Sequence, residues 1–561
     1  MLLNKYGTLR QEILTDETYF ELEFKSKLGM PDQFMTEATV LTTARDVVLT
    51  GCDHTDITKA RIQVPAHADT DKANEDAKRL RRFYYGLINM TVQNADINPW
   101  RVASTYFWAY GMACLRTLWD PHRWPDKPVK SAGQSTKEYE LVLDNWRAQR
   151  HESLPIAIDA IHPYCVMPDP TVGPPRYVME NFQKLCVDIK GRYSTWMNPK
   201  DKKPWEEVEW TAYYDLEYYC YLADDEPVLP QGIAKHNYGH LPHSFAYSGM
   251  GVDGTDGAPE KKCVGFLRHL RDELRSESRN FSIHDVVMKR GGWPFIYLDG
   301  ENAESQEDFT WEYGQLNRLK PGVELKELKN FGLPTDKLIQ QMQVSSDYIA
   351  KHAAPPTMRG MPSDKATGFQ KERLLAGQAS LKYNHGKVAF QRLTEQVCKK
   401  AARLTKNLLS DDMRVWAQTP QDEFDILLKG EDMVEPFVIY MEFSPIDELD
   451  EIQRDENTRR NIEVGLIDVE TARKSKSNIN PDEVKENLLK EAMYQQMVPM
   501  VYQFYLQPKL LEALSKRMAS EGGMPMPQMG APGQPGAQMA GPNQMPIQMP
   551  QAGVAPGPGM M

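Results

Sequence analysis

The segment from about Leu333 to Asp411 constrains the fold most, because it holds two helical patterns separated by a pair of prolines. After Thr335, which can cap a helix, apolar residues recur with a helical period. Pro355-Pro356 must end that helix, since proline donates no backbone hydrogen bond and disfavours the helical conformation of the residue before it. A second pattern opens at the capping box Thr367–Gln370 and continues for about 40 residues, roughly 60 Å of helix. The segment therefore predicts a helix, a Pro-Pro loop and a very long helix.

Composition places the chain among ordinary soluble proteins, with 41% hydrophobic and 26% charged residues. No apolar run is long enough to cross a bilayer, and the first six residues lack the apolar core of a signal peptide. Seven scattered cysteines without a CxxC pair predict a reduced, cytosolic origin. The net charge of −12 excludes an overall basic face for nucleic acid. A local basic patch, or an acidic wall to which DNA does not adhere, both remain open.

The region before residue 260 shows mixed helix and strand signals. A helix is expected over 71–89 and another after Asn98-Pro99, running into a strand over 114–119. Residues 122–153 are charged and poor in apolar periodicity, which indicates a surface insertion. Residues 156–247 alternate between strand-like runs and turns, and predict an antiparallel sheet.

The region after residue 260 is predominantly helical around a small β unit. A charged helix ending near Arg290 is followed by a strand over 294–298, a turn and a strand pair around Pro321-Gly322. A strand over 437–443 follows the long helix, and further helical pieces follow that strand. From Gly522 onward the chain has no charged side chain and is rich in Met, Pro, Gly and Gln, which predicts a disordered tail.

Catalytic motifs are absent from the sequence. It contains no GxxxxGK[ST] phosphate loop, no HExxH and no GxSxG, so it predicts no enzyme, and it implies no cofactor. His236, His240 and His243 form the densest histidine cluster. Pro242 prevents a helix from aligning the last two, and no cysteine or carboxylate completes a zinc set. A polar loop is therefore preferred over a metal site.

The order of these segments resembles the portal protein of tailed bacteriophages over residues 60 to 515. Four groups of residues carry the resemblance, all of them in the family's order along the chain. They are Phe83-Tyr84-Tyr85-Gly86-Leu87 with Leu118-Trp119-Asp120-Pro121, Asn237-Tyr238-Gly239-His240-Leu241-Pro242, Pro355-Pro356 with Met358-Arg359-Gly360 and Ala366-Thr367-Gly368, and Phe443-Ser444-Pro445-Ile446-Asp447 with Gly465-Leu466-Ile467-Asp468-Val469-Glu470-Thr471-Ala472. The insertion at 122–153 and the uncharged tail depart from the family's pattern.

The resemblance implies an α+β, predominantly helical, ring-forming fold with wing, stem, clip and crown. Its parts are an α+β wing region (1–259), a stem helix (260–290), a clip (291–333), a second stem helix (334–354), a tunnel loop (355–368), a long wing helix with closing strand (369–445), crown helices (446–520) and the tail (521–561).

The resemblance also implies a function. Twelve copies typically form a ring at one capsid vertex, and double-stranded DNA passes through its channel during packaging and ejection. The implied partners are the terminase large subunit, the head–tail adaptor, and the major capsid and scaffold proteins. The chain would be made in the host cytoplasm, end in the virion and contact no membrane.

Two sets of site residues follow from the resemblance. The tunnel loop contains Thr357, Met358, Arg359, Gly360, Met361, Ser363, Asp364 and Lys365. The stem residues expected to pack between copies are Val264, Leu267, Leu270, Leu274, Leu338, Met342 and Ile349. Arg359 is equally compatible with transient phosphate contacts and with a salt bridge to a neighbour.

Two alternatives come from other classes of protein. One is another ring-forming virion or scaffold protein, which would lack the interrupted order of stem, clip and stem. The other is a metal-dependent hydrolase that uses the histidines of 236–243. An axial channel would argue against the first, and stoichiometric bound metal would support the second.

Overall fold

The computed structural model describes residues 2–171, 173–198, 201–252, 257–292, 296–300, 319, 321–327, 335–352, 369–418, 423–443, 456, 458–464 and 488–494. The chain divides into two units, Met1–Pro481 and Asp482–Met561. The described part of the second unit is the helical stretch 488–494. Within the described residues no helix is long and apolar enough to cross a membrane.

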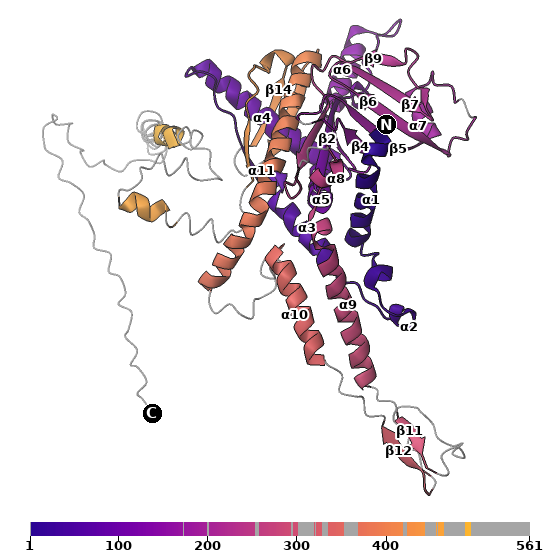
Figure 1. Ribbon diagram of the computed structural model, residues 1–561. Coiled ribbons are helices and arrows are strands. Elements are labelled where there is room, and N and C mark those ends of the chain that lie inside the picture. Colours follow the sequence, from indigo (N-terminus) through magenta and orange to yellow (C-terminus); the bar gives the residue numbers. More distant parts are fainter. Residues whose placement is uncertain are drawn as a thin grey trace, which may run out of the picture. The chain divides into compact units, whose positions relative to one another are not determined.

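The first unit contains both helices and strands (Figure 1). The α-helices are α1 (Leu2–Phe20), α2 (Asp32–Met35), α3 (Thr43–His54), α4 (Asp71–Asn94), α5 (Pro99–Tyr110), α6 (Thr136–Arg150), α7 (Cys186–Arg192), α8 (Pro259–Lys262), α9 (Phe266–Gly292), α10 (Thr335–His352) and α11 (Phe369–Leu408). The strands are β1 (Ala60–Gln63), β2 (Met112–Trp119), β3 (Ile156–Ile161), β4 (Val166–Pro168), β5 (Val178–Leu185), β6 (Glu207–Tyr214), β7 (Tyr218–Ala223), β8 (Glu226–Pro227), β9 (Ile233–Lys235), β10 (His243–Tyr247), β11 (Ile296–Asp299), β12 (Glu324–Glu327), β13 (Met413–Gln418), β14 (Glu423–Leu428) and β15 (Tyr440–Phe443).

The strands form antiparallel sheets, as expected for 156–247. A six-stranded sheet has the order β4-β5-β6-β7-β8, with β9 also paired to β7. A three-stranded sheet has the order β10-β2-β3. In its register His243 faces Arg116 and Arg116 faces Asp159, so three polar residues form one row across the sheet. The pairs β1–β15, β11–β12 and β13–β14 are separate two-stranded sheets.

The passage from α5 to β2 is determined locally, and the sequence predicted it. The side chain of Asn98 accepts hydrogen bonds from the backbone N–H groups of Trp100 and Arg101, which caps the helix. Gly111 ends the helix with φ +82°, the left-handed conformation that glycine adopts without strain. Met112 to Leu115 are all buried, so both faces of β2 are covered at its start.

The long helix α11 spans 40 residues, as the sequence predicted. It contacts β2, β10 and β15, and these contacts bury one stripe of the helix. The buried residues of this stripe include Tyr383, Phe390, Leu393, Val397, Ala401 and Leu404. At Gly386 a side chain would lie 2.4 Å from the ring of Trp108, so glycine permits the close approach of α11 to α5. The closing strand β15 covers 440–443 and is shorter than the predicted strand over 437–443.

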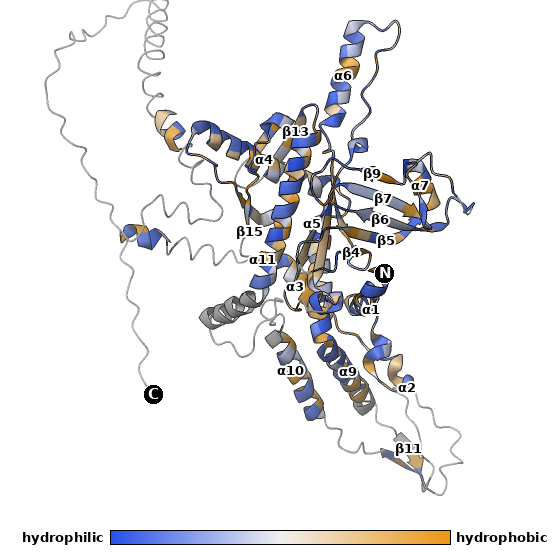
Figure 2. Ribbon diagram, turned by 45° about the horizontal axis from the view of Figure 1, so that its top comes forward, coloured by the Kyte–Doolittle hydropathy of each residue, from blue (hydrophilic) through white to orange (hydrophobic). Residues whose placement is uncertain are grey.

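The insertion at 122–153 contains a helix that the sequence analysis did not predict. Ser135 and Glu138 form the capping box of α6, each side chain bonding to the other residue's backbone N–H. Figure 2 shows α6 as largely hydrophilic, which is why apolar periodicity did not reveal it. Its last residue, Arg150, is buried and pairs with Asp411 and Asp412, which anchors the insertion to the end of α11.

The predicted helix over 260–290 is wrong at its start, because the structure interrupts it between α8 and α9. The side chain of Ser248 donates a 2.6 Å hydrogen bond to the carbonyl of Val264. A side chain at Gly265 would lie 2.1 Å from the carbonyl oxygen of Ala109. Residues 263–265 therefore pack against the end of α5 in a non-helical conformation. Val264 lies outside the helix and is not part of a stem stripe.

We expect Gly111→Ala to destabilise the chain by more than the roughly 1–2 kcal/mol of left-handed strain. The added methyl would also lie 2.3 Å from the backbone of Val264, which cannot move independently. Gly29→Ala is the control, since Gly29 has φ +68° and nothing within 4 Å of an added Cβ. Urea unfolding of both variants measures the difference. Equal losses of stability would contradict the close packing at Gly111.

Candidate functional site

The first half of α9 is anchored in its own chain. Leu267, Leu270 and Leu274 are fully buried, and the helix contacts α1, α3 and α5. Farther along, the hydroxyl groups of Ser278 and Ser282 accept hydrogen bonds from the backbone N–H groups of Leu41 and Thr39. The three leucines were predicted to pack between copies of the chain. Their surface is already used within one copy, so they are not available to a neighbour.

Charged side chains lock α9 to α1. Arg271 Nη1 lies 2.6 Å from Glu12 Oε2, and Arg271 Nη2 lies 2.7 Å from Asp16 Oδ1. Arg268 Nε lies 3.6 Å from the second oxygen of Asp16, which is fully buried. Burial raises the pKa of Asp16 to about 6, against the opposing attraction of Arg271 and Arg268. Because both arginines are held by α1, they are not offered to a ligand at this surface.

Helix α10 leaves more apolar surface exposed than α9. It packs against α9, and Ile349 is fully buried. Leu338 and Met342, two of the predicted stem residues, are half-buried. Val344 is 67% exposed and Ile339 41% exposed. A packing role between copies therefore stays a prediction for Leu338 and Met342. Ile339 and Val344 are exposed as well, but they lie about 140° apart around α10 and so on different sides of it.

The predicted tunnel loop lies outside the described residues, since 353–368 are not among them. Thr357 through Lys365, with Arg359, therefore stay predictions. In the predicted clip, the strand expected over 294–298 is present as β11 and pairs with β12, with Ile296 opposite Glu327 and Asp299 opposite Glu324. The strand pair expected around Pro321-Gly322 lies partly outside the described residues. A side chain at Gly300 would lie 2.0 Å from the carbonyl oxygen of Gly322, which explains glycine at this turn.

Residues 236–242 form a loop, as preferred in the sequence analysis, but the histidines of 236–243 do not face solvent. All three are buried, and His243 is the first residue of β10. His236 Nε2 lies 3.0 Å from the backbone oxygen of Asp215, and His243 Nε2 bonds to Glu180. Among the described residues no group of three His, Cys, Asp or Glu side chains could hold a metal ion. The structure thus separates the three imidazoles into different environments and gives the hydrolase alternative no metal site there.

A network of charged side chains joins the three-stranded sheet, the six-stranded sheet and α11. Arg116 on β2 donates to Glu180 on β5 at 2.7 Å and to Asp159 on β3 at 2.9 Å. His243 on β10 donates from Nε2 to the other Glu180 oxygen at 2.5 Å. Burial would raise the pKa of Glu180, but Arg116 and the His243 hydrogen bond outweigh it and hold that pKa below its usual value. Burial lowers the pKa of His243, so the histidine is neutral. The three-stranded and six-stranded sheets are therefore joined through one ionised carboxylate.

Lys400 connects α11 to this network. Its ammonium group donates a 2.5 Å hydrogen bond to the backbone oxygen of His243. Burial lowers the pKa of Lys400 to about 7, and the nearby Arg403 adds to the effect. Sequence analysis missed this network, because its five members come from five elements and no spacing along the chain relates them.

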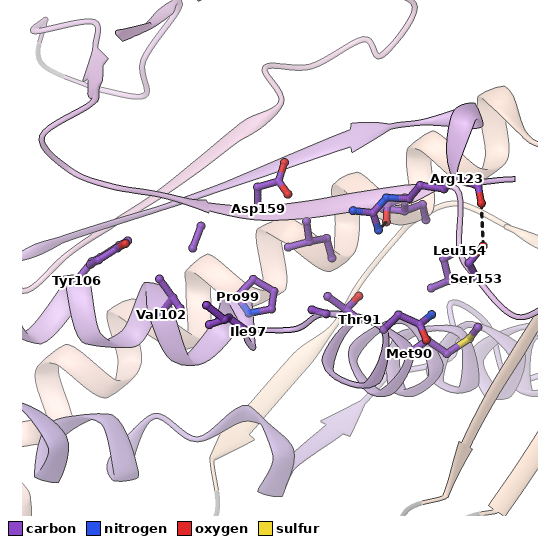
Figure 3. A pocket seen from close by; sticks show the side chains of 15 residues that line it. Met90, Thr91, Ile97, Pro99, Val102, Tyr106, Arg123, Ser153, Leu154 and Asp159 are labelled. Carbon is purple, nitrogen blue, oxygen red and sulfur yellow. Dashed lines mark hydrogen bonds between the residues drawn. The ribbon is translucent and has the colours of Figure 1, made fainter. Parts of the chain in front are cut away.

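A cavity of about 570 Å³ lies between the end of α4, the start of α5 and β3. Figure 3 shows its lining, which is mostly apolar and includes Met90, Ile97 and Val102. Arg123 and Asp159 are its charged lining side chains. Arg123 donates to the backbone oxygen of Ile156, and Asp159 pairs with Arg116, so both are already engaged. The cavity shows no arrangement of an acid, a base and a nucleophile.

Comparisons with known proteins found no matching family model and no matching curated protein. Among solved structures, the chain is similar to one in the neck of an empty gene transfer agent particle, computed with C6 symmetry. That chain is 10% identical with a TM-score of 0.38, over 79% of this chain and 93% of its own length. A chain in the virion of a native gene transfer agent particle is also 10% identical, with a TM-score of 0.37 over the same shares. The proposal below rests on the chain's own elements.

We expect Glu180→Gln to destabilise the chain by about 3–5 kcal/mol, since it leaves Arg116 buried without its closest counter-charge. Asp425→Asn is the matched control. It breaks the pair between Arg414 and Asp425, whose side chains are 43% and 54% exposed, and should cost at most about 1 kcal/mol. Urea unfolding at pH 7 measures both. A loss at Glu180 no larger than the control would refute the role of the network.

Lys400 should make stability depend on pH in the alkaline range. In the unfolded chain a lysine takes up its proton near the usual pKa of 10.5, whereas folded Lys400 does so only near 7. The unfolded state therefore binds more protons between these values, and the stability of the natural chain should rise with pH across the window. Lys400→Met should flatten this rise, and Lys399→Met should not. Parallel unfolding curves for all three chains between pH 7 and 10 would contradict the burial of the amine.

Proposed function

We propose that this chain is the portal protein of a tailed-bacteriophage-like particle, forming the ring through which viral DNA is packaged and ejected. The observation that carries the proposal is the order of elements from α9 to α11: a helix, a two-stranded unit, a second helix against the first, then a 40-residue helix. This order supports the expected stem, clip, stem and wing helix. The proposed partners are the terminase large subunit, the head–tail adaptor, the capsid and scaffold proteins, and the DNA in the channel.

Exposed apolar side chains on α10 support assembly into a ring. Burying apolar surface stabilises a contact by about 25 cal/mol per Å². A neighbouring copy would therefore gain stability by covering Val344 and Ile339, which face water in the single chain. Helix α9 is anchored in its own chain by its buried face, and α10 packs against α9. We therefore propose that α10 contacts its two neighbours in a ring through different sides, one with Leu338, Ile339 and Met342 and the other with Val344.

A narrow part of the channel is proposed at the loop 355–368. Under this proposal Arg359 meets phosphates only transiently, because the overall charge of −12 opposes stable binding of DNA to the channel wall. The alternative of another ring-forming virion or scaffold protein predicts rings without an axial channel, and imaging separates the two.

The double variant Ile339→Asp with Val344→Asp should abolish ring formation while each copy still folds. Both side chains are exposed in a single chain, so the substitutions cost little stability, but two carboxylates would become buried in the contact between copies. Gln340→Asp with Gln343→Asp, at exposed polar positions of the same helix, is the control. Negative-stain imaging with mass photometry should show closed rings of about a dozen copies with a central hole for the natural chain and the control.

Rings formed by the Ile339 and Val344 variant would show that α10 is not the contact. A natural chain that stays monomeric at high concentration, alone and with its scaffold protein, would refute the portal assignment itself.

A further inference from the structure

The solvent-facing side of α11 is basic, which is unusual in a chain of net charge −12. Between Tyr383 and Leu408 the helix has six lysine and arginine residues and a single acidic residue, Glu395. Arg392, Lys399, Arg403 and Lys406 lie seven, four and three residues apart, which places them on one side of an α-helix. We call these four side chains the basic face of α11.

The cations of this face are mostly unneutralised. Within the described part of the chain, Arg392, Lys399 and Arg403 have no carboxylate at ion-pair distance, and only Lys406 has one, Glu435 at 3.0 Å. Glu395 does not compensate them, because its carboxylate accepts a hydrogen bond from the backbone N–H of Met441 on β15. Elsewhere in the first unit arginines such as Arg116 and Arg271 are engaged by acidic side chains. Among the described residues, the basic face therefore concentrates positive charge that is largely uncompensated.

The side chains around these cations are polar as well. Arg392, Gln396, Arg403 and Asn407 are exposed, and Val388 is the only exposed large apolar residue of α11 after Tyr383 among the described positions. Figure 2 shows these hydrophilic turns along α11. A protein-binding surface normally has an apolar or aromatic centre and few lysines, whereas a surface for nucleic acid is polar and positively charged throughout. The composition of the face favours nucleic acid over a protein partner.

The length of the face also fits a duplex. At 1.5 Å per residue the four cations span about 21 Å of helix. The same length of double-stranded DNA carries roughly twelve phosphates, so each cation can reach at least one. The helix is held firmly in this position because its opposite side is buried against β2, β10 and β15.

We propose that the basic face of α11 binds the phosphate backbone of double-stranded DNA without regard to sequence. This contact is separate from the loop 355–368 and does not depend on the function proposed above. Arg392, Lys399 and Arg403 would carry most of the binding, since Lys406 is shared with Glu435. Their buried neighbour Lys400 holds the helix to His243 and does not reach the ligand.

The test uses the full-length chain and a fluorescent 30-base-pair duplex, with binding followed by anisotropy between 50 and 200 mM salt. The variant carries Arg392→Gln, Lys399→Gln and Arg403→Gln. The control carries Lys72→Gln, Lys137→Gln and Lys190→Gln, three exposed lysines of α4, α6 and α7, and so has the same net charge. Thermal melting checks that both are folded.

We expect the logarithmic salt dependence of the association constant to be shallower by about 2.7 in the α11 variant, for three lost phosphate contacts. The control should keep the slope of the natural chain. Equal effects in both variants, or none in either, would overturn the proposal. So would a natural chain that binds no duplex at 50 mM salt.

A competition experiment adds polyglutamate, at the same concentration of charge as unlabelled DNA, to the chain bound to the fluorescent duplex. If it displaces the duplex as well as unlabelled DNA does, an acidic polypeptide is the better partner and the assignment to DNA is wrong. Ring formation is measured separately by microscopy. If the natural chain binds DNA through α11 but forms no rings, only the portal function is refuted. If it forms rings but does not bind DNA through α11, only the proposal for the basic face is refuted.

Discussion

The ion pair between Arg116 and Glu180 joins the two main sheets of the first unit. The Arg116 side chain is 18% exposed and that of Glu180 is fully buried. Arg116 lies between His243 and Asp159 in the register of the three-stranded sheet and reaches across to Glu180 in the six-stranded sheet. An uncompensated charge at this depth would cost several kcal/mol, so the two sheets can adopt only the arrangement in which Arg116 and Glu180 meet. Through the backbone of His243 the same network also holds Lys400, and with it the long helix α11. Three separate parts of the chain are thereby held in one arrangement.

Helices α9 and α10 differ in how much of their apolar surface is buried within the chain. Helix α9 packs its apolar face against α1, α3 and α5 of its own chain, and its two arginines form ion pairs with α1. It cannot serve equally as a surface for neighbours, because side chains that are already buried gain nothing further from contact. Helix α10 is packed on α9 by fewer residues and keeps Ile339 and Val344 in water. Under the proposed ring assembly, α9 would stabilise each copy and α10 would contact the neighbouring copies.

Several expectations from the sequence concerned local features and were confirmed. The helix after Asn98-Pro99 that runs into a strand, and the 40-residue length of α11, each depend on residues close together in the chain. Others were wrong for reasons that lie elsewhere in the chain. Residues 263–265 leave the helix because Ala109 and Ser248 occupy the space around them. His236, His240 and His243 are buried because two sheets and α11 close over a segment that reads as polar.

The sequence by itself determined many helix and strand positions, because caps, prolines, glycines and apolar periods act over a few residues, but it did not reveal α6 or the break at 263–265. It also determined the order of helix, small strand pair, helix and long helix. Only the tertiary structure decided which charges are neutralised. Arg116, Asp159, Glu180 and His243 are spread over nearly 130 positions. Strand register aligns Arg116, Asp159 and His243, and packing between the two sheets brings Glu180 to them. The same holds for the basic face of α11, where Arg392, Arg403 and Lys406 are exposed and Lys399 half-buried because the neighbouring strands cover the opposite side of the helix. Pairing and exposure depend on contacts between distant segments, and no local pattern contains them.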